Sequence, residues 1–172
     1  MICKKMLLLI LANLFTIFLS KTLTAPANYR ATIPAGRPLY IYGLSDPFAR
    51  AVAYIESRFI PDIVNPYSGA RGLFQFMPVM IEEVNKIQRR KEILSLVILH
   101  SAIRLPRYTW SDAFDPVKSV EMYYIVQQWK NPEYYHDKMV KIWFGTGKQH
   151  DGKTWCNYFN ELMPVYEAFK GS

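Results

Sequence analysis

Residues 51–59 read AVAYIESRF, and after a short loop residues 68–78 read SGARGLFQFMP. In and just before the first stretch, apolar residues recur at helical spacing, and they predict one apolar stripe made of Phe48, Val52, Ile55 and Phe59. At about 100° per residue, Glu56 falls on the edge of this stripe, where an apolar wall meets water. Partial burial disfavours a charged carboxylate and raises its pKa, so Glu56 is a candidate proton donor near neutral pH.

The second stretch has the composition of a saccharide-binding wall. Gly69 and Gly72 let the backbone approach a ligand closely, and Gln75 supplies an amide. The apolar residues around Gln75 are expected to close the floor of a cleft. We therefore expect Glu56 and this stretch to share one site, with the rest of the chain as its scaffold.

Helix signals recur along residues 45–172, which we interpret as one mainly α-helical domain. Asp46 and Asp115 each place a capping carboxylate before a proline, which favours a helix start. Pro78 opens a further helix, and residues 93–99, apolar on all sides, are expected to form the central core helix. Other helices are expected to run from 117 to about 129, to end at 145–147, and to run from about 154 to 169. No stretch alternates in the manner of a core strand.

The N-terminal residues 1–27 have the three regions of a secretory signal peptide. Lys4 and Lys5 precede the uncharged run 6–20, and Ala25-Pro26-Ala27 supplies a small-x-small cleavage site. A retained membrane anchor is the alternative, although the run is short for a bilayer span. We expect a cleaved signal followed by an irregular lead-in over residues 28–44. The mature protein is then periplasmic or secreted, without stable membrane insertion.

The charge of the chain is moderately basic, with 21 Lys and Arg against 14 Asp and Glu and a net charge of +7. Signal cleavage removes three lysines and leaves the protein basic, which suits an anionic partner such as peptidoglycan or nucleic acid. The basic run 89–91 is interpreted as a solvated helix face, so no nucleic acid partner is expected. The sequence does not indicate a protein partner.

Cysteine and histidine usage predicts neither a disulfide nor a cofactor. After signal cleavage only Cys156 remains, so no intrachain disulfide can form. His100, His136 and His150 lie far apart and in no ligand spacing, so no metal site is predicted.

Glu56-Ser57, Asn65-Pro66 and residues 68–78 together resemble the signature of soluble lytic transglycosylases, which are lysozyme-like proteins related to goose-type lysozyme. The family pattern is Glu-Ser, a loop, and Gly-Ala-x-Gly-Leu-Met-Gln-x-Met-Pro. Its next block resembles Asp115-Pro116, and its aromatic-Asn-x-Gly block resembles the segment 143–147. Phe74 stands where the family usually has Met and Phe144 where it usually has Asn. The resemblance covers residues 48–80 and, more thinly, 112–160, whereas 87–110 match no part of it.

This resemblance implies a single lysozyme-like helical domain with a cleft, and a peptidoglycan lytic transglycosylase that cleaves MurNAc-β-1,4-GlcNAc bonds. Glu56 would act as general acid and then as general base, while the muramyl 6-hydroxyl attacks and leaves a 1,6-anhydro end. Gln75 and Met77 would line the saccharide site, and Asn65 would stand where the family usually has a serine. The remaining expected substrate contacts are Ser57, Gly72, Phe76, Trp143 and Tyr158.

Two other functions stay open on the sequence. A hydrolase of the same fold, a muramidase or chitinase, would need a second carboxylate, for which the candidates are Asp62, Asp112, Asp115 and Glu121. Asp112 and Asp115 are more simply explained as turn and cap residues, and an intramolecular attack needs no second carboxylate. A non-catalytic glycan-binding or assembly protein is the other alternative.

Several site candidates also have structural explanations. Gln75 has a second, less favoured explanation as a loop-capping amide, and Asn65 before Pro66 is explained equally as a turn former. Aromatic residues at helical spacing, such as Trp143 and Tyr158, usually belong to a core.

Overall fold

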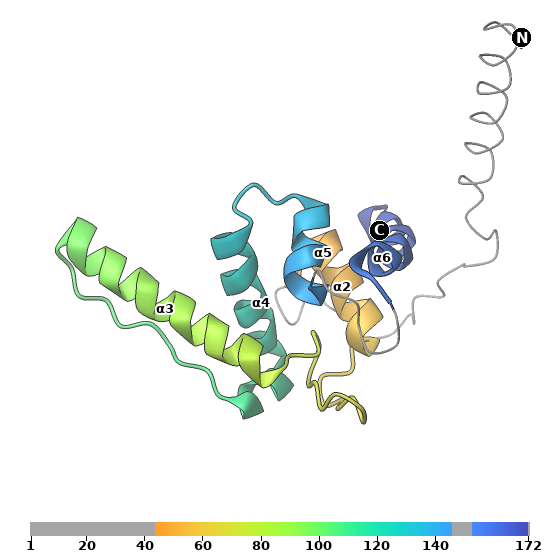
Figure 1. The fold of residues 1–172 in the computed structure, drawn as a ribbon, viewed down its shortest axis with the longest axis horizontal. Helices are drawn as coiled ribbons and strands as arrows, with labels where there is room; N and C mark the ends of the chain where they lie inside the picture. Colours follow the sequence, from red (N-terminus) through yellow and green to blue (C-terminus); the bar gives the residue numbers. More distant parts are fainter. Residues whose placement is uncertain (1–43, 146–152, 172) are drawn as a thin grey trace, which may run out of the picture. The chain divides into compact units, whose positions relative to one another are not determined.

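The computed structural model describes residues 44–145 and 153–171, all within a compact unit that begins at Ala35. These residues form helices joined by loops, with isolated β-bridges but no strand in the described ranges. The helices are α2 (Pro47–Ser57), α3 (Pro78–Leu99), the 3-10 helix η2 (Trp110–Phe114), α4 (Pro116–Lys130), α5 (His136–Phe144) and α6 (Trp155–Lys170) (Figure 1). The expected mainly α-helical class is confirmed.

Some expectations fall outside these residues. The signal peptide over 1–27 and nearly all of the lead-in over 28–44 lie outside the described residues, as do Gly147 and His150. These stay predictions. Within the described ranges, no helix is both long enough and apolar enough to cross a bilayer.

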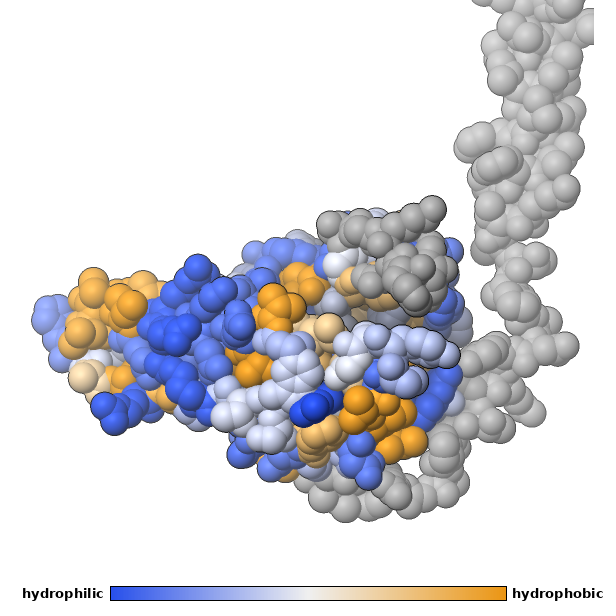
Figure 2. All heavy atoms as spheres, turned by 60° about the horizontal axis from the view of Figure 1, so that its bottom comes forward, coloured by the Kyte–Doolittle hydropathy of each residue, from blue (hydrophilic) through white to orange (hydrophobic). Residues whose placement is uncertain are grey.

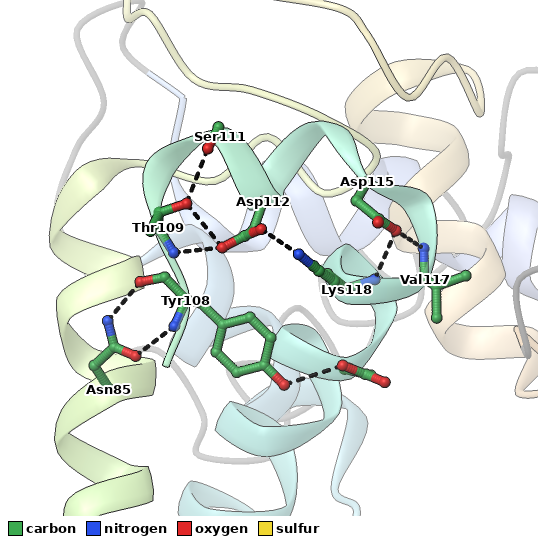
Figure 3. Close-up of polar contacts among 9 residues, drawn as sticks. Asn85, Tyr108, Thr109, Ser111, Asp112, Asp115, Val117 and Lys118 are labelled. Atoms are coloured by element: carbon green, nitrogen blue, oxygen red, sulfur yellow. Dashed lines mark hydrogen bonds and ion pairs between the residues drawn. The ribbon is translucent and has the colours of Figure 1, made fainter. Parts of the chain in front are cut away.

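The two Asp-Pro helix starts are confirmed. Asp46 caps α2, where its carboxylate accepts hydrogen bonds from the backbone N–H groups of Phe48 and Ala49, both at 3.1 Å. Asp115 caps α4 in the same way, accepting from the N–H groups of Val117 at 2.9 Å and Lys118 at 3.2 Å (Figure 3). Each cap satisfies helix-end donors that have no partner within the helix.

The core is built around α2, which is buried along most of its length. Its apolar residues pack against α6, which also packs against α5, while α4 connects α5 to α3. Phe48, Val52 and Phe59 of the expected stripe are buried, and Ile55 is half-buried. Helix α2 ends at Ser57 because Arg58 takes a left-handed conformation, with φ of 54°.

The expectation that residues 93–99 form a central core helix is wrong. These residues are the last two turns of one continuous helix, α3, which is buried earlier along its length through Ile81, Val84 and Ile87 and packs there against α4. Beyond that contact α3 extends past α4, and among the described residues only the returning segment 100–109 runs beside it (Figure 1). The apolar side chains of residues 93–99 are therefore exposed, and the one polar residue among them, Ser95, is buried.

Three polar side chains of α3 hold the returning segment. Asn85 forms two hydrogen bonds with the backbone of Tyr108, of 2.8 and 2.9 Å (Figure 3). Glu92 accepts from the backbone N–H of Leu105 at 2.7 Å. Ser95 donates to the carbonyl of Ser101 at 2.9 Å. We call residues 86–109, which are α3 from Lys86 onward together with this returning segment, the α3 arm.

The loop between α2 and α3, residues 58–77, is folded on itself by backbone contacts. Isolated antiparallel bridges join Val64 to Arg71 and Arg71 to Phe76. The guanidinium of Arg71 lies over the rings of Trp110 and Phe114, 4.7 and 5.2 Å from their centroids, and so attaches the loop to η2. This loop carries most of the expected substrate contacts.

Candidate functional site

Glu56 lies in the last turn of α2, one residue before its end, and is half-buried. Its position follows from the helical stripe, because Val52 and Phe59, one turn before and after it, are buried in the core where α2 packs against α6. The expected placement at the edge between the core and water is what the structure has.

Burial raises the pKa of Glu56 from its usual 4.5 to about 7. Two weaker effects oppose this: the hydrogen bond from Tyr158 and the positive charge of Lys153 both lower the pKa. A carboxyl group with a pKa near 7 is protonated in half of the molecules at neutral pH. It can therefore both give and take a proton under physiological conditions.

Tyr158, on α6, is the direct partner of Glu56. Its hydroxyl donates a hydrogen bond of 2.7 Å to Oε1 of Glu56, and its ring is buried. The bond fixes one oxygen of the carboxyl group. The sequence predicted Tyr158 as a substrate contact, whereas the structure shows it bonded to the candidate acid.

Phe144 stands where the family pattern has Asn, and its packing shows how an aromatic ring fits at this position. It is the last residue of α5, and its ring lies 4.9 Å from the ring of Tyr158, tilted by 33°. Phe144 therefore packs against the tyrosine that holds Glu56. An apolar ring at this position displaces water beside Tyr158, in keeping with a carboxyl group whose pKa is raised by burial.

Asn65 and Gln75 both use their side chains to hold the 58–77 loop. Oδ1 of Asn65 accepts from the backbone N–H groups of Tyr67 at 2.9 Å and Ser68 at 3.2 Å, as an Asx turn does. Nε2 of Gln75 donates to the carbonyl of Gly72 at 3.0 Å, and Gln75 has a positive φ of 50°. The amide therefore stabilises a backbone conformation that a non-glycine residue rarely adopts.

Gly72 is required by the contact between the loop and η2. Its φ is +77°, and a Cβ atom there would lie 1.8 Å from the carbonyl oxygen of Ala113. The close approach expected at Gly72 is thus to the chain's own backbone. Gly69, with a similar φ of +74°, has open space around its Cα.

Phe76 and Trp143 belong to a buried aromatic cluster with Phe74 and Tyr123. Phe74 stacks on Tyr123 with centroids 4.3 Å apart, and Trp143 packs edge-on against Phe76 at 5.1 Å. The indole N–H of Trp143 donates to the carbonyl of Phe74 at 3.2 Å. This cluster anchors the 58–77 loop to α4 and α5.

The last two expected contacts are Ser57 and Met77. Ser57 is buried and its hydroxyl donates to the carbonyl of Ala53 at 2.9 Å, inside its own helix. Met77 is half-buried at the start of α3, in an extended conformation. Of the loop residues expected at the saccharide site, Asn65, Gln75 and Met77 are half-buried, whereas Gly72 and Phe76 are buried.

Three of the four candidate second carboxylates have local partners. Asp112 pairs with Lys118 at 2.6 Å and caps η2 through Thr109, while Asp115 caps α4 (Figure 3). Glu121 accepts a 3.0 Å hydrogen bond from the hydroxyl of Tyr108 and lines a pocket of about 450 Å³ along α4. Asp62 is exposed in the 58–77 loop. In the described part of the chain, no group of three or more His, Cys, Asp or Glu residues could hold a metal ion.

Lys153 is the residue near Glu56 that the sequence did not indicate. Its charge lowers the pKa of Glu56, although Lys153 also forms an ion pair with Glu161 at 3.1 Å. No local pattern marks it, because it lies 97 positions after Glu56 and meets it only through the packing of α6 on α2.

A comparison with protein families supports the resemblance noted in the sequence. The family model described as transglycosylase SLT domain matches residues 35–134, more than half of the chain. No curated protein and no solved structure matches the chain. The matched range includes Glu56 and the whole 58–77 loop, but it ends before α5 and α6.

Proposed function

Starting from the fact that the chain belongs to the transglycosylase SLT family, we propose that it is a peptidoglycan lytic transglycosylase with Glu56 as its single acid and base. The family match supports a peptidoglycan-related function. The observation that carries the specific proposal is the Glu56 carboxyl group, which has a pKa of about 7 and is held by the 2.7 Å bond from Tyr158.

In the first step, protonated Glu56 gives its proton to the oxygen that bridges MurNAc and GlcNAc. The bond between this oxygen and C1 of MurNAc breaks, and GlcNAc leaves with a free 4-hydroxyl. The raised pKa supports this step, because a carboxyl group with a pKa of 4.5 is almost fully ionised at neutral pH and has no proton to give.

In the second step, ionised Glu56 takes the proton of the MurNAc 6-hydroxyl. The oxygen of this hydroxyl group then forms a bond to C1 of the same MurNAc. The product is a 1,6-anhydro ring, and Glu56 returns to its protonated form without uptake of water. This attack is intramolecular and so gains from high effective concentration without a second carboxylate. The local partners of Asp112, Asp115 and Glu121 favour this mechanism over one with two carboxylates.

We further propose that Gln75 and Met77 contact the glycan strand in a cleft beside Glu56. Both are half-buried in the described chain, and Gln75 keeps its amide oxygen as an acceptor while Nε2 bonds to Gly72. The bonds made by Ser57, Asn65, Gly72, Phe76 and Trp143 support a different role for them, which is to hold the wall on which Gln75 and Met77 lie. Export through a cleaved signal peptide would bring this site to the cell wall.

The decisive experiment is a mass measurement on products released from purified peptidoglycan sacculi. The parent protein is expected to release anhydromuropeptides. The masses of the two products of each cleavage then sum to the mass of the uncleaved strand, without the added water of hydrolysis. Glu56→Gln is expected to lower the rate by a factor on the order of 10² to 10⁴ while the protein stays folded. Asp62→Asn is the matched control, because it removes an exposed carboxylate and should leave both rate and product unchanged.

The other outcomes identify the alternatives. Products with reducing ends that carry one oxygen from labelled water would assign the protein as a hydrolase. Binding of glycan that is equal in the parent and in Glu56→Gln, with no product from either, would assign it as a glycan-binding protein without turnover.

A further inference from the structure

The α3 arm ends in a group of exposed apolar side chains that no other part of the described chain covers. We call this group the apolar tip; its members are Ile93, Leu94, Leu96, Val97, Ile98, Leu99 and Ile103. Their exposed fractions run from 44% at Leu94 to 70% at Leu99. Exposure of this many neighbouring large apolar residues indicates an interaction site. From its shape and its charge, we propose that the apolar tip docks onto an anionic phospholipid surface and inserts into its interface.

The apolar residues lie around the helix on all sides except that of Ser95, which bonds to the returning segment. Residues 93, 94 and 96–99 occupy six of seven consecutive positions, and steps of about 100° spread these around the rest of the circumference. A folded protein partner buries one face of a helix and leaves a polar face in water. A lipid phase contacts all faces at once and therefore fits this pattern better.

The single polar residue in this run also agrees with a lipid environment. Ser95 is buried, and its hydroxyl bonds to the carbonyl of Ser101. Nearby, Glu92 binds the backbone N–H of Leu105. The Ser95 hydroxyl and the Glu92 carboxylate are thus paired within the arm, as a low-dielectric environment favours.

The length of the tip suits the interface of a bilayer and not its full thickness. Seven helical residues span about 10 Å. That matches the insertion depth of about 5–10 Å seen for interfacial helices and is far below the hydrocarbon thickness of about 30 Å. The proposed docking is therefore peripheral, in agreement with the finding that no described helix could cross a membrane.

Charge selects an anionic surface. The arm holds the basic residues Lys86, Arg89, Arg90, Lys91, Arg104 and Arg107 and one acidic residue, Glu92. Glu92 pairs with Arg107 at 2.5 Å, while Arg89, Arg90 and Arg104 are exposed. Figure 2 shows hydrophilic residues directly beside the apolar group at the end of the arm. Basic residues next to an inserted apolar group add attraction to anionic headgroups.

The test places a fluorescent reporter in the tip of the full chain. Leu99→Trp and Val79→Trp form a matched pair, because both positions are on α3 and are 70% and 65% exposed. Each variant is mixed with phosphatidylglycerol vesicles whose acyl chains are brominated and quench nearby tryptophan. Quenching beyond that of the parent is expected for Leu99→Trp and not for Val79→Trp. The N-terminal apolar run is identical in both variants and cannot produce this difference.

Two further variants test the chemistry. Leu96→Ser with Val97→Ser, placed in the Leu99→Trp chain, should weaken vesicle binding of the reporter roughly tenfold or more, because the inserted apolar area is lost. Arg89→Gln with Arg104→Gln in the same chain should weaken it too, and added salt should then matter less. All these positions are exposed, so melting temperatures and release of anhydromuropeptides from sacculi should match the parent.

The proposal is overturned if Leu99→Trp is quenched no more than Val79→Trp, or if phosphatidylcholine vesicles quench it as strongly as phosphatidylglycerol vesicles. It is also overturned if sedimentation without lipid shows a dimer that Leu96→Ser with Leu99→Ser dissociates. That result would assign the apolar tip to a second copy of the chain.

Discussion

The carboxyl group of Glu56 combines burial and a fixed orientation, and each effect has a separate source. The packing of α2 against α6 removes water and raises the pKa, while Tyr158 holds one oxygen and lowers the pKa. The balance leaves a pKa of about 7, where proton donation and acceptance are both accessible.

Tyr158→Phe should therefore move the pH dependence of activity. Removing the hydroxyl removes a hydrogen bond that lowers the pKa of Glu56, so this pKa rises above 7. Activity that needs protonated Glu56 is then retained to higher pH, and we expect its alkaline limb to shift upward by up to about one pH unit. A profile of kcat/KM against pH on isolated glycan strands measures the shift. Tyr166→Phe, on the same helix, should leave the limb in place.

Glu56→Gln should change the pH dependence of stability. The folded protein holds the proton of Glu56 more tightly than the unfolded chain does, since the pKa rises from 4.5 to about 7 on folding. The resulting stabilisation is complete below pH 4.5 and is lost as the pH rises through 7, by about 1–3 kcal/mol. Denaturant titrations at pH 5 and pH 8 should show this loss in the parent and not in Glu56→Gln. An equal loss in both proteins would contradict the raised pKa.

At the scale of elements, the 58–77 loop depends on contact with η2. Arg71 lies over two aromatic rings of η2, and Gly72 meets the carbonyl of Ala113 directly. The position of the loop is thus fixed both by its own backbone hydrogen bonds and by its contacts with η2.

Gly72→Ala and Gly69→Ala should differ sharply. Both residues have a positive φ, of +77° and +74°, so both variants strain the backbone by about 1 kcal/mol. Only at position 72 does the new methyl group overlap backbone, so we expect Gly72→Ala to cost about 2 kcal/mol or more beyond Gly69→Ala. Chemical denaturation of both variants measures the difference. Equal losses would show that η2 moves away without cost.

Local signals were enough to predict most of the α-helices and several of their boundaries, although not η2 or the continuity of α3. Each Asp-Pro start is determined by a proline and by a carboxylate that caps backbone N–H groups two and three residues further on. Both starts are found as expected. The error over residues 93–99 has a physical reason. A run that is apolar on all sides indicates burial away from water. Whether another element of the same chain or a separate partner buries it does not depend on the run itself. In this chain the described elements do not cover it.

The candidate site was predictable in part for a similar reason. Glu56 could be placed from the spacing of the residues around it. Its bond to Tyr158 joins positions 102 apart in sequence, and its pKa depends on the whole α2–α6 contact, so neither has a local signature. Asn65 and Gln75 were expected either at the saccharide or in a turn, and both make the turn contacts.

For the whole molecule, the fold separates a packed body from the α3 arm. Helices α2, α4, α5 and α6 and the first turns of α3 supply most of the buried helical residues. The outer part of the arm, from Glu92 to Leu105, is held by polar contacts between α3 and its returning segment. Stability should accordingly reside in the body.

Leu162→Ala and Leu99→Ala test this division. Leu162 is fully buried and Leu99 is 70% exposed, although both are helical leucines. Leu162→Ala should lower the free energy of unfolding by about 2–4 kcal/mol, and Leu99→Ala by less than about 0.5 kcal/mol. Urea denaturation of the two variants gives the comparison. A large loss for Leu99→Ala would mean that the arm is buried in solution.

The bond between Glu56 and Tyr158 also bears on how this chain is divided for experiments. The segment that carries the family signature stops at residue 134, but the hydroxyl that steadies the acid comes from residue 158. A fragment that ends with the signature would keep every motif residue from Glu56 to Met77. It would lose α6, the helix that excludes water from the carboxyl group and orients it. Its glutamate would titrate like one in a short peptide, and a chemist assaying it at neutral pH would conclude, wrongly, that the acid is absent.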